Sequence, residues 1–219
     1  METRPIDVYA MGESRHLYRL ASSTEPEPGW ETLCHLGRQV SSIAVCGGIL
    51  YGVLPDGTVA KRPLLSVEPS ARQLLFWRDD FDWQLCAPGK VRNLAAQGRL
   101  LATNEHDDLI ELHVSGQAWM LASCYKATCV AIHAGYVYVV GQPDTRGSTH
   151  IWRHRLSNIT HDSHWQRLCV SPANVLSGMV VLDNGTAILA LKNDGVLWKG
   201  CGTSGRWTWS IYYDLYRFI

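Results

Sequence analysis

The chain has 219 residues, of which 46% are hydrophobic and 18% charged, and its 20 Lys and Arg residues equal its 20 Asp and Glu residues. This balance leaves no basic excess for the phosphate backbone of a nucleic acid, and no apolar run reaches the roughly 18 residues needed to cross a membrane. We therefore expect neither nucleic-acid binding nor membrane insertion, and the apolar content suits a well-buried globular core.

The chain holds seven cysteines and no CxxC pair. The N-terminal residues lack the apolar core of a secretory signal, so we expect a cytoplasmic protein with free thiols. Four of the cysteines follow a tryptophan by three to five residues, and we expect these four to be buried packing residues: Cys34, Cys86, Cys124 and Cys169.

In chain order, the first predicted element is a hairpin over 6–20, followed by a strand from Trp30. The segment "GGILYGVLPDGTVAKRPL" at 47–64 repeats the hairpin pattern, with Tyr9 equivalent to Tyr51, and "SSIAV" precedes it. The same order of elements then recurs along the chain: a strand that begins with a tryptophan, an apolar run, a turn that contains glycine, and a second apolar run. The marker tryptophans lie 36 to 53 residues apart, at Trp30, Trp83, Trp119, Trp165 and Trp207.

Repeats of this length with about four strands each are typical of β-propeller blades. The sequence therefore predicts an all-β, single-domain, five-bladed β-propeller over 1–219, with almost no helix. Four continuous blades occupy about 40–213, and a fifth is split between 214–219, which supplies its innermost strand, and 1–36. Such a split closes the ring without leaving an open sheet edge. Residues 65–82 form an insertion.

The motifs "GGILYGVLPDGTVAKR", "AGYVYVV" and "NGTAILALKNDGVLWKG", together with the outer Trp30 or Trp83, resemble tectonin-type propeller repeats and the five-bladed tachylectin-type lectins. The likeness covers essentially the whole chain. It implies a ring that binds glycans at low-affinity sites near the blade junctions. Several related rings are instead platforms that dock other proteins, so the resemblance leaves both roles open.

The predicted innermost strands read SSIAV, RNLAA, TCVAI, SGMVV and LYRFI, and none carries a carboxylate. A propeller glycosidase needs paired acids facing the channel. We therefore do not expect an enzyme or a cofactor. An enzyme would require an acid or metal cluster that converges in the channel from elsewhere in the chain.

Histidines concentrate between residues 150 and 164. Zinc sites use three or four such ligands, but the spacing here matches no standard motif, and we do not expect a metal. The only candidate ligands are His150, His154, His161 and His164.

The hairpin turns and the connections into the innermost strands should share one face of the disc. Loops held by a rigid scaffold commonly carry recognition, although any single member can equally be a hydrated turn residue. The candidates in the turns are Asp56, His106, Asp107, Asp144, Arg146 and Asp194, those in the connections are Arg38, Lys90, Lys126 and Asn174, and Trp77 lies in the insertion.

The sequence pattern leaves two functions open: a scaffold that docks a protein or peptide on this face, and a lectin-like ring with shallow sites between blades. A multivalent glycan binder should repeat its site residues from blade to blade. The turns "PDG", "EHDD", "PDTRGST" and "NDG" differ from one another. This irregularity favours the docking scaffold.

Overall fold

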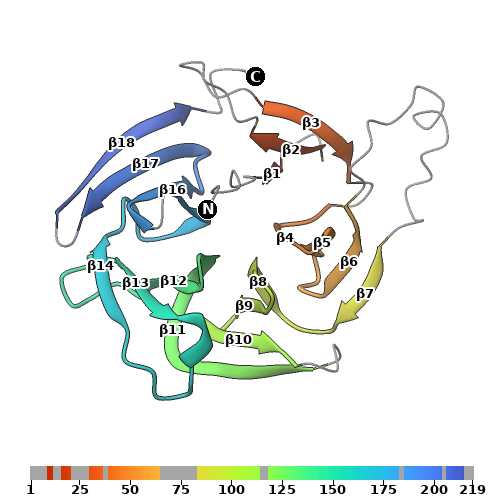
Figure 1. The fold of residues 1–219 in the computed structure, drawn as a ribbon, viewed down its shortest axis with the longest axis horizontal. Coiled ribbons are helices and arrows are strands. Elements are labelled where there is room, and N and C mark those ends of the chain that lie inside the picture. The colour runs from red at the N-terminus through yellow and green to blue at the C-terminus, as the bar shows by residue number, and fades with distance from the viewer. Residues whose placement is uncertain are drawn as a thin grey trace, which may run out of the picture.

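The protein was analysed as a computed structural model, which describes residues 9–11, 16–20, 30–36, 39–64, 83–113, 118–182, 185–203 and 206–214. Strands are arranged as successive antiparallel sheets around a centre (Figure 1). In the described residues the helical content is limited to 3₁₀ turns, namely η2 (Leu156–Asn158) and a turn that includes Gly185. None of the described residues belongs to a helix long and apolar enough to span a bilayer.

Two sheets come from the first part of the chain, and in both the order of strands follows the order of the chain. The first is β1-β2-β3, and the second is β4-β5-β6-β7. Their bounds are β1 (Tyr9–Met11), β2 (His16–Leu20), β3 (Trp30–His35), β4 (Ser42–Cys46), β5 (Ile49–Val53), β6 (Val59–Pro63) and β7 (Gln84–Ala87).

The middle of the chain forms one seven-stranded sheet. Its strand β11 is 15 residues long, and it pairs with β10 through residues 119–126 and with β12 through residues 127–133. Two groups of four strands therefore share this strand. The bounds are β8 (Val91–Ala96), β9 (Leu100–Asn104), β10 (Asp108–Leu112), β11 (Trp119–His133), β12 (Tyr136–Gly141), β13 (His150–Arg155) and β14 (Gln166–Val170).

The last sheet has the order β15-β16-β17-β18. It contains β15 (Leu176–Leu182), β16 (Ala187–Lys192), β17 (Val196–Thr203) and β18 (Arg206–Asp214). The predicted order within a repeat, from the channel outward, is confirmed for 42–63 with the Trp83 strand. The predicted innermost strand over 214–219 and the insertion 65–82 lie outside the described residues, apart from Asp214, which ends β18.

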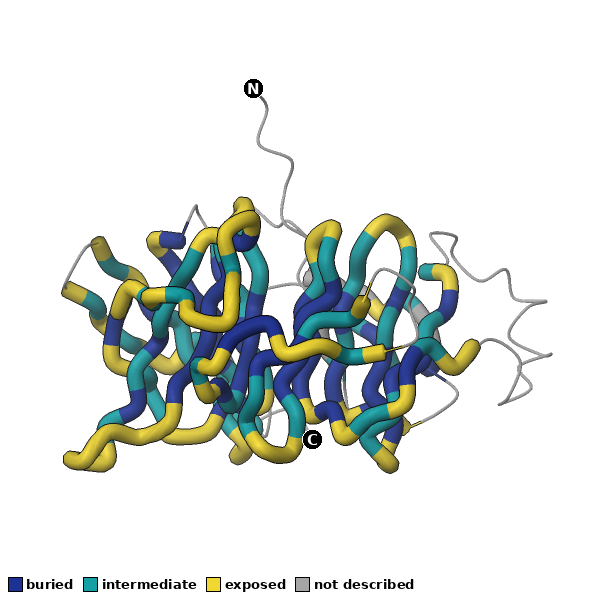
Figure 2. The backbone as a smooth tube through the Cα atoms, turned by 90° about the horizontal axis from the view of Figure 1, so that it is seen from below, coloured by how far each residue is buried: buried dark blue, intermediate teal, exposed yellow. Residues whose placement is uncertain are grey.

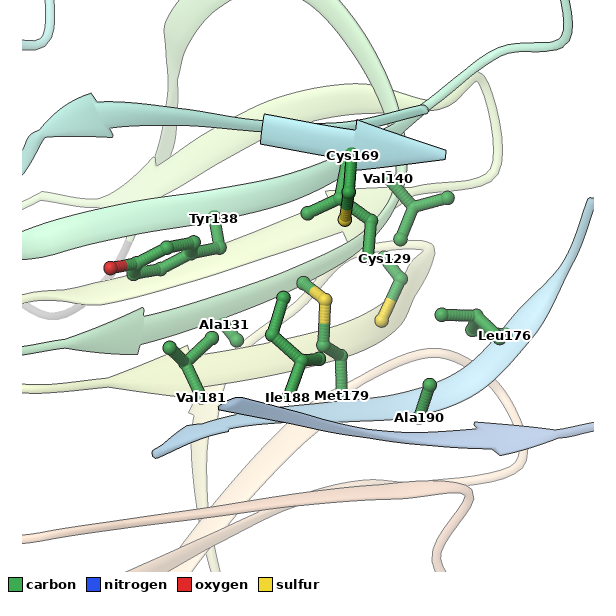
Figure 3. Close-up of a cluster of buried hydrophobic side chains, with 11 residues drawn as sticks. Cys129, Ala131, Tyr138, Val140, Cys169, Leu176, Met179, Val181, Ile188 and Ala190 are labelled. Carbon is green, nitrogen blue, oxygen red and sulfur yellow. The ribbon is translucent and has the colours of Figure 1, made fainter. Parts of the chain in front are cut away.

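The hydrophobic core is divided into clusters that lie between neighbouring groups of strands. One joins Val53 and Val59 to Leu94 and Ala102. The cluster in Figure 3 joins residues of β11–β14, such as Tyr138, to residues of β15 and β16. Figure 2, which views the disc from its side, shows buried residues in the middle and exposed ones at the turns on its two faces. Burial between radially packed sheets explains why the second strands are apolar on both faces.

A buried polar ladder ties the innermost strands together. Ser42 of β4 accepts a hydrogen bond from the backbone N–H of Leu94 at 3.1 Å. Asn93 of β8 in turn accepts one from the backbone N–H of Val130 in β11 at 2.9 Å. β4 therefore satisfies a donor on β8, and β8 satisfies one on β11, as buried polar groups require.

Two of the marker tryptophans, Trp83 and Trp165, connect neighbouring groups of strands, as predicted. The indole N–H of Trp83 donates to the carbonyl of Leu36 at 2.7 Å. Trp165 donates to the Ser123 hydroxyl at 3.3 Å. In the last sheet the equivalent bond, to the carbonyl of Val170 at 3.0 Å, comes from Trp209 rather than from the marker Trp207.

The prediction that the repeated cysteines are buried is wrong for Cys124, which is exposed. The buried position lies four residues after the marker tryptophan, where the chain places Ala87, Ser123 and Cys169 at 1%, 0% and 8% exposure. Cys124 lies five residues after its tryptophan. Since side chains alternate between the faces of a strand, one extra residue turns the thiol outward.

Candidate functional site

The hairpin turns and the connections into the innermost strands meet on one face, as the sequence predicted. The N–H of Val91 donates to the carbonyl of Gly57 at 3.0 Å, and the N–H of Glu105 donates to that of Lys90 at 2.9 Å. At the next junction the N–H of Ser171 donates to the carbonyl of Thr149 at 2.8 Å. We call this surface the turn face, formed by residues 54–58, 88–90, 104–108, 124–126, 142–149, 171–175 and 192–196.

Three of the predicted aspartates stabilise their own turns. The Asp56 carboxylate accepts the N–H of Thr58 at 2.8 Å, and this backbone bond lowers its pKa. Asp144 accepts the N–H groups of Ser148 and Arg146, both at 2.9 Å, and its pKa is lowered for the same reason. Asp194 pairs with Lys192 at 2.7 Å, which lowers its pKa. Such Asx turns are structural.

Two other predicted turn residues, His106 and Asp107, lie at one junction. Asp107, with φ at 60°, accepts hydrogen bonds from Arg92 at 3.1 Å and from Gln142 at 3.2 Å. Its carbonyl accepts the N–H of Ala127 at 2.7 Å. We name this group the Asp107 corner; it comprises Arg92, His106, Asp107, Asp108, Lys126 and Gln142.

Lys126 completes the corner. Its ammonium group donates to the Asp108 carboxylate at 2.5 Å and to the carbonyl of His106 at 3.1 Å. The hydrogen bond from Lys126 is the main cause of the lowered pKa of Asp108. The corner therefore joins the turn after β9, the start of β8, the middle of β11 and the residue after β12.

The remaining predicted residues are placed singly. Asn174 accepts a hydrogen bond from the Thr149 hydroxyl at 3.1 Å. Lys90 and Arg146 are exposed on the turn face. Arg38 and Trp77 lie outside the described residues.

The four candidate metal-binding histidines do not come together. The ring of His150 lies 6.2 Å from that of Trp152, and the ring of His154 lies 5.5 Å from that of Trp165. Over the described part of the chain, the one group of three or more potential ligands is Cys124, His161 and Asp162, whose ligand atoms lie within 4.8 Å of one another. All three are exposed.

Sequence reasoning missed a cleft on the seam between β13–β14 and β17–β18. Its volume is about 630 Å³. One wall carries basic side chains and the other carries two indoles, and the buried cluster of Figure 3 lies against both Trp207 and Trp209. We call it the seam cleft; the residues that define it here are His150, Arg153, Arg167, Val170, Trp207 and Trp209.

The aromatic wall follows from a pairing across the β17–β18 hairpin. Gly200 is paired with Trp209, and Gly202 with Trp207. A Cβ atom at either glycine would lie 2.7 Å from the ring of its partner, so only glycine lets the indoles lie over β17. The two rings are stacked, with centroids 6.3 Å apart. We call this pair the tryptophan shelf.

The basic wall is partly fixed in place. The Arg153 guanidinium donates to Gln166 at 3.0 Å and lies 5.5 Å above the centre of the Tyr136 ring. Arg167 is exposed. None of the described residues that line the cleft is Asp or Glu. The signal that could have revealed the site is the G-x-G spacing at 200–202 facing W-x-W at 207–209.

No protein-family model matches the chain, and no curated protein matches its sequence. Among solved structures, a chain of a nidogen/laminin complex is 11% identical, with a TM-score of 0.58 over 94% of this chain and 78% of that one. The chain has a β-propeller fold. Two structures are less similar: YCF48 bound to D1 peptide (13% identity, TM-score 0.46, 97% of this chain, 65% of that) and the designed Ika8 protein (10%, 0.44, 90%, 58%).

Proposed function

We propose that this propeller is a non-catalytic module that docks a protein or peptide on its turn face. The observation that carries the proposal is the Asp107 corner, where hydrogen bonds join segments of two neighbouring strand groups into one polar surface. A rigid surface of this kind presents a fixed pattern of donors and acceptors to a partner. The exposed residues of the turn face include His106, Lys90 and Arg146.

We also propose that the ring consists of five blades and forms a single domain. The two four-strand groups that share β11 count as two blades, and the sheets β4–β7 and β15–β18 as two more. The sheet β1–β3 lies between β18 and β4 in Figure 1. Asp214 belongs to β18, so we assign the rest of the predicted 214–219 segment, residues 215–219, as the fourth, innermost strand of this sheet. We also propose a cytoplasmic location, which suits the six free thiols of the described cysteines.

Docking is favoured over glycan binding because the turn face does not repeat a site. Asp56, Asp144 and Asp194 occupy equivalent turns, but their carboxylates bind backbone N–H groups of those turns. The comparisons give no support to a lectin, and the similar fold in the nidogen/laminin structure occurs within a complex. The innermost strands β4, β8 and β15 carry no acid that a glycosidase would need.

The proposal is tested by affinity purification from a cell lysate with quantitative mass spectrometry. We expect a protein partner that the unaltered chain retains and that the double variant His106→Glu, Arg146→Glu loses. Both side chains are exposed, so neither change should disturb the fold.

The matched control is Gln84→Glu, an exposed residue of the outer strand β7, which should retain the partner. A glycan array is run beside the purification. Glycan binding without any protein partner, or equal loss of the partner in the control, would contradict docking on the turn face.

A further inference from the structure

We propose that the seam cleft binds an acidic peptide segment with an apolar anchor residue, as a second site distinct from the turn face. The proposal goes beyond docking on the turn face and does not depend on it. It is built on three observations: basic side chains that form no ion pair with a described acid, an aromatic shelf, and exposed apolar side chains that continue past the cleft. The Asp144 carboxylate attracts Arg167 and His150, but it lies beyond ion-pair distance from both.

The basic wall is complementary to carboxylates. In the described residues, no Asp or Glu lines the cleft, and no acidic oxygen lies within 4 Å of the charged nitrogens of Arg153 or Arg167. Gln166 and the ring of Tyr136 hold the Arg153 guanidinium in one orientation. A guanidinium placed in advance loses less side-chain freedom when it forms a two-point contact with a carboxylate.

The opposite wall provides an apolar surface. The rings of Trp207 and Trp209 are stacked over β17, and the indole N–H of Trp209 is bound to Val170, which fixes that ring. Rigid aromatic side chains in a recess are the usual anchors of a bound peptide. Val170 is 53% exposed at the edge of the cleft, and Ile211, two residues beyond Trp209, is 61% exposed.

The distribution of these groups favours an extended peptide over a compact ligand. A volume of about 630 Å³ accommodates a few side chains, and the exposed apolar residues extend the surface along β14 and β18. A sugar site would pair an aromatic platform with carboxylate or amide acceptors. Here the aromatic rings face cationic donors, which select an anionic ligand.

The test uses a phage-displayed library of random short peptides, selected on the full chain and counter-selected on Arg167→Glu. We expect a consensus of Asp and Glu flanking a Leu, Ile, Phe or Trp. A synthetic consensus peptide should bind the full chain, and Arg167→Glu should weaken it by at least about tenfold. Since Arg167 is exposed, the variant should fold, which near-UV circular dichroism checks.

Arg146→Glu serves as the matched control, because it makes the same charge reversal on the turn face and should leave peptide affinity unchanged. Selection without a consensus, a consensus without acidic residues, or equal affinity for the full chain and Arg167→Glu would overturn the proposal. The basic wall and the indoles could also hold a nucleotide. If the full chain bound ADP and no peptide was selected, the proposal would be overturned as well. Since each proposal has its own variant, a failure at the cleft leaves docking on the turn face untouched.

Discussion

The Asp107 corner and the seam cleft lie at neighbouring junctions of the same ring, yet they treat charge in opposite ways. In the corner, Arg92 and Lys126 bind Asp107 and Asp108. In the cleft, Arg153 is bound to a neutral Gln166, and Arg167 forms no ion pair with a described acid, although the Asp144 carboxylate attracts it from beyond ion-pair distance. The corner's polar groups are satisfied within the chain, whereas the cleft's positive charges remain available to a ligand.

Charged residues in a turn are therefore weak indicators of a site until their partners are known. Hydrogen-bonded groups build a surface of defined shape, and charges that lack a partner give that surface its chemical preference. We therefore expect changes at the paired carboxylates of the corner to alter stability slightly, and changes at its exposed His106 or at the cleft to alter binding. The tryptophan shelf is the exception, because it carries both packing and recognition.

The largest effect is expected at the glycine beneath the shelf. Gly200→Val places a branched side chain where even a Cβ would lie 2.7 Å from the Trp209 ring. The indole must leave β17, and overpacking of this kind should lower the free energy of unfolding by about 3 kcal/mol. Urea denaturation measures the loss, and near-UV circular dichroism reports the displaced indole.

Gly178→Val is the matched control. Gly178 lies in β15, where a Cβ would meet nothing within 4 Å. A branched residue suits an extended strand, so this variant should unfold close to the parent midpoint. Equal destabilisation by the two variants would show that the shelf does not require a glycine beneath it.

A smaller loss is expected where a satisfied polar group is buried. Asn93 is 7% exposed and follows Arg92 of the corner in the chain. Asn93→Leu leaves the Val130 N–H without its acceptor, which should cost about 2 kcal/mol in unfolding free energy. Asn158→Leu, at an exposed position, is the control. Should Asn93→Leu unfold at the same denaturant concentration as the parent, the ladder between inner strands contributes nothing.

The repeat and the strand order within it could be predicted because each unit has its own turn signals and apolar runs. The number of separate sheets could not. The chain between Ser123 and Thr128 contains neither Gly nor Pro, so β11 continues unbroken from one strand group into the next. The boundary between the two strand groups within β11 is marked only by a change of pairing partner, from β10 to β12. The local sequence gives no signal of such a change.

The sequence predicted the turn face but not the seam cleft, because the cleft also depends on strand pairing. The gathering of turns on one face follows from antiparallel order, and the structure confirms it. The seam cleft depends on which residues lie opposite each other across β17 and β18. That register places Gly200 under Trp209, and it is set by the hairpin rather than by either strand alone. Partners such as Gln142 for Asp107 are equally invisible in the sequence.

At the corner itself we expect only a small change from Asp107→Asn. Asparagine tolerates the positive φ of this position, so the change removes charge without backbone strain. The ion pair with Arg92 is largely exposed on the arginine side, at 56%, and such pairs contribute about 0.5 kcal/mol. Denaturation at low and high salt measures it: the parent should lose the small advantage at high salt, and the variant should not change. A loss several times larger would place the corner among the main determinants of stability.

The smallest effect concerns protonation at the corner. The pKa of Asp108 lies below the usual 3.8, chiefly because Lys126 donates to its carboxylate. A lowered pKa in the folded state means that this contribution is complete above the ordinary pKa and is lost as the pH falls through the folded value. Lys126→Met should raise the pKa of Asp108 toward 3.8 and weaken this acid dependence, as an NMR titration of its carboxyl group would record. Lys192→Met should instead raise the pKa of Asp194 and leave Asp108 unchanged, because Lys192 pairs with Asp194 alone among the described acids. If Asp108 titrated identically in the parent and in Lys126→Met, the corner would be held by shape rather than by charge, and its contrast with the seam cleft would disappear.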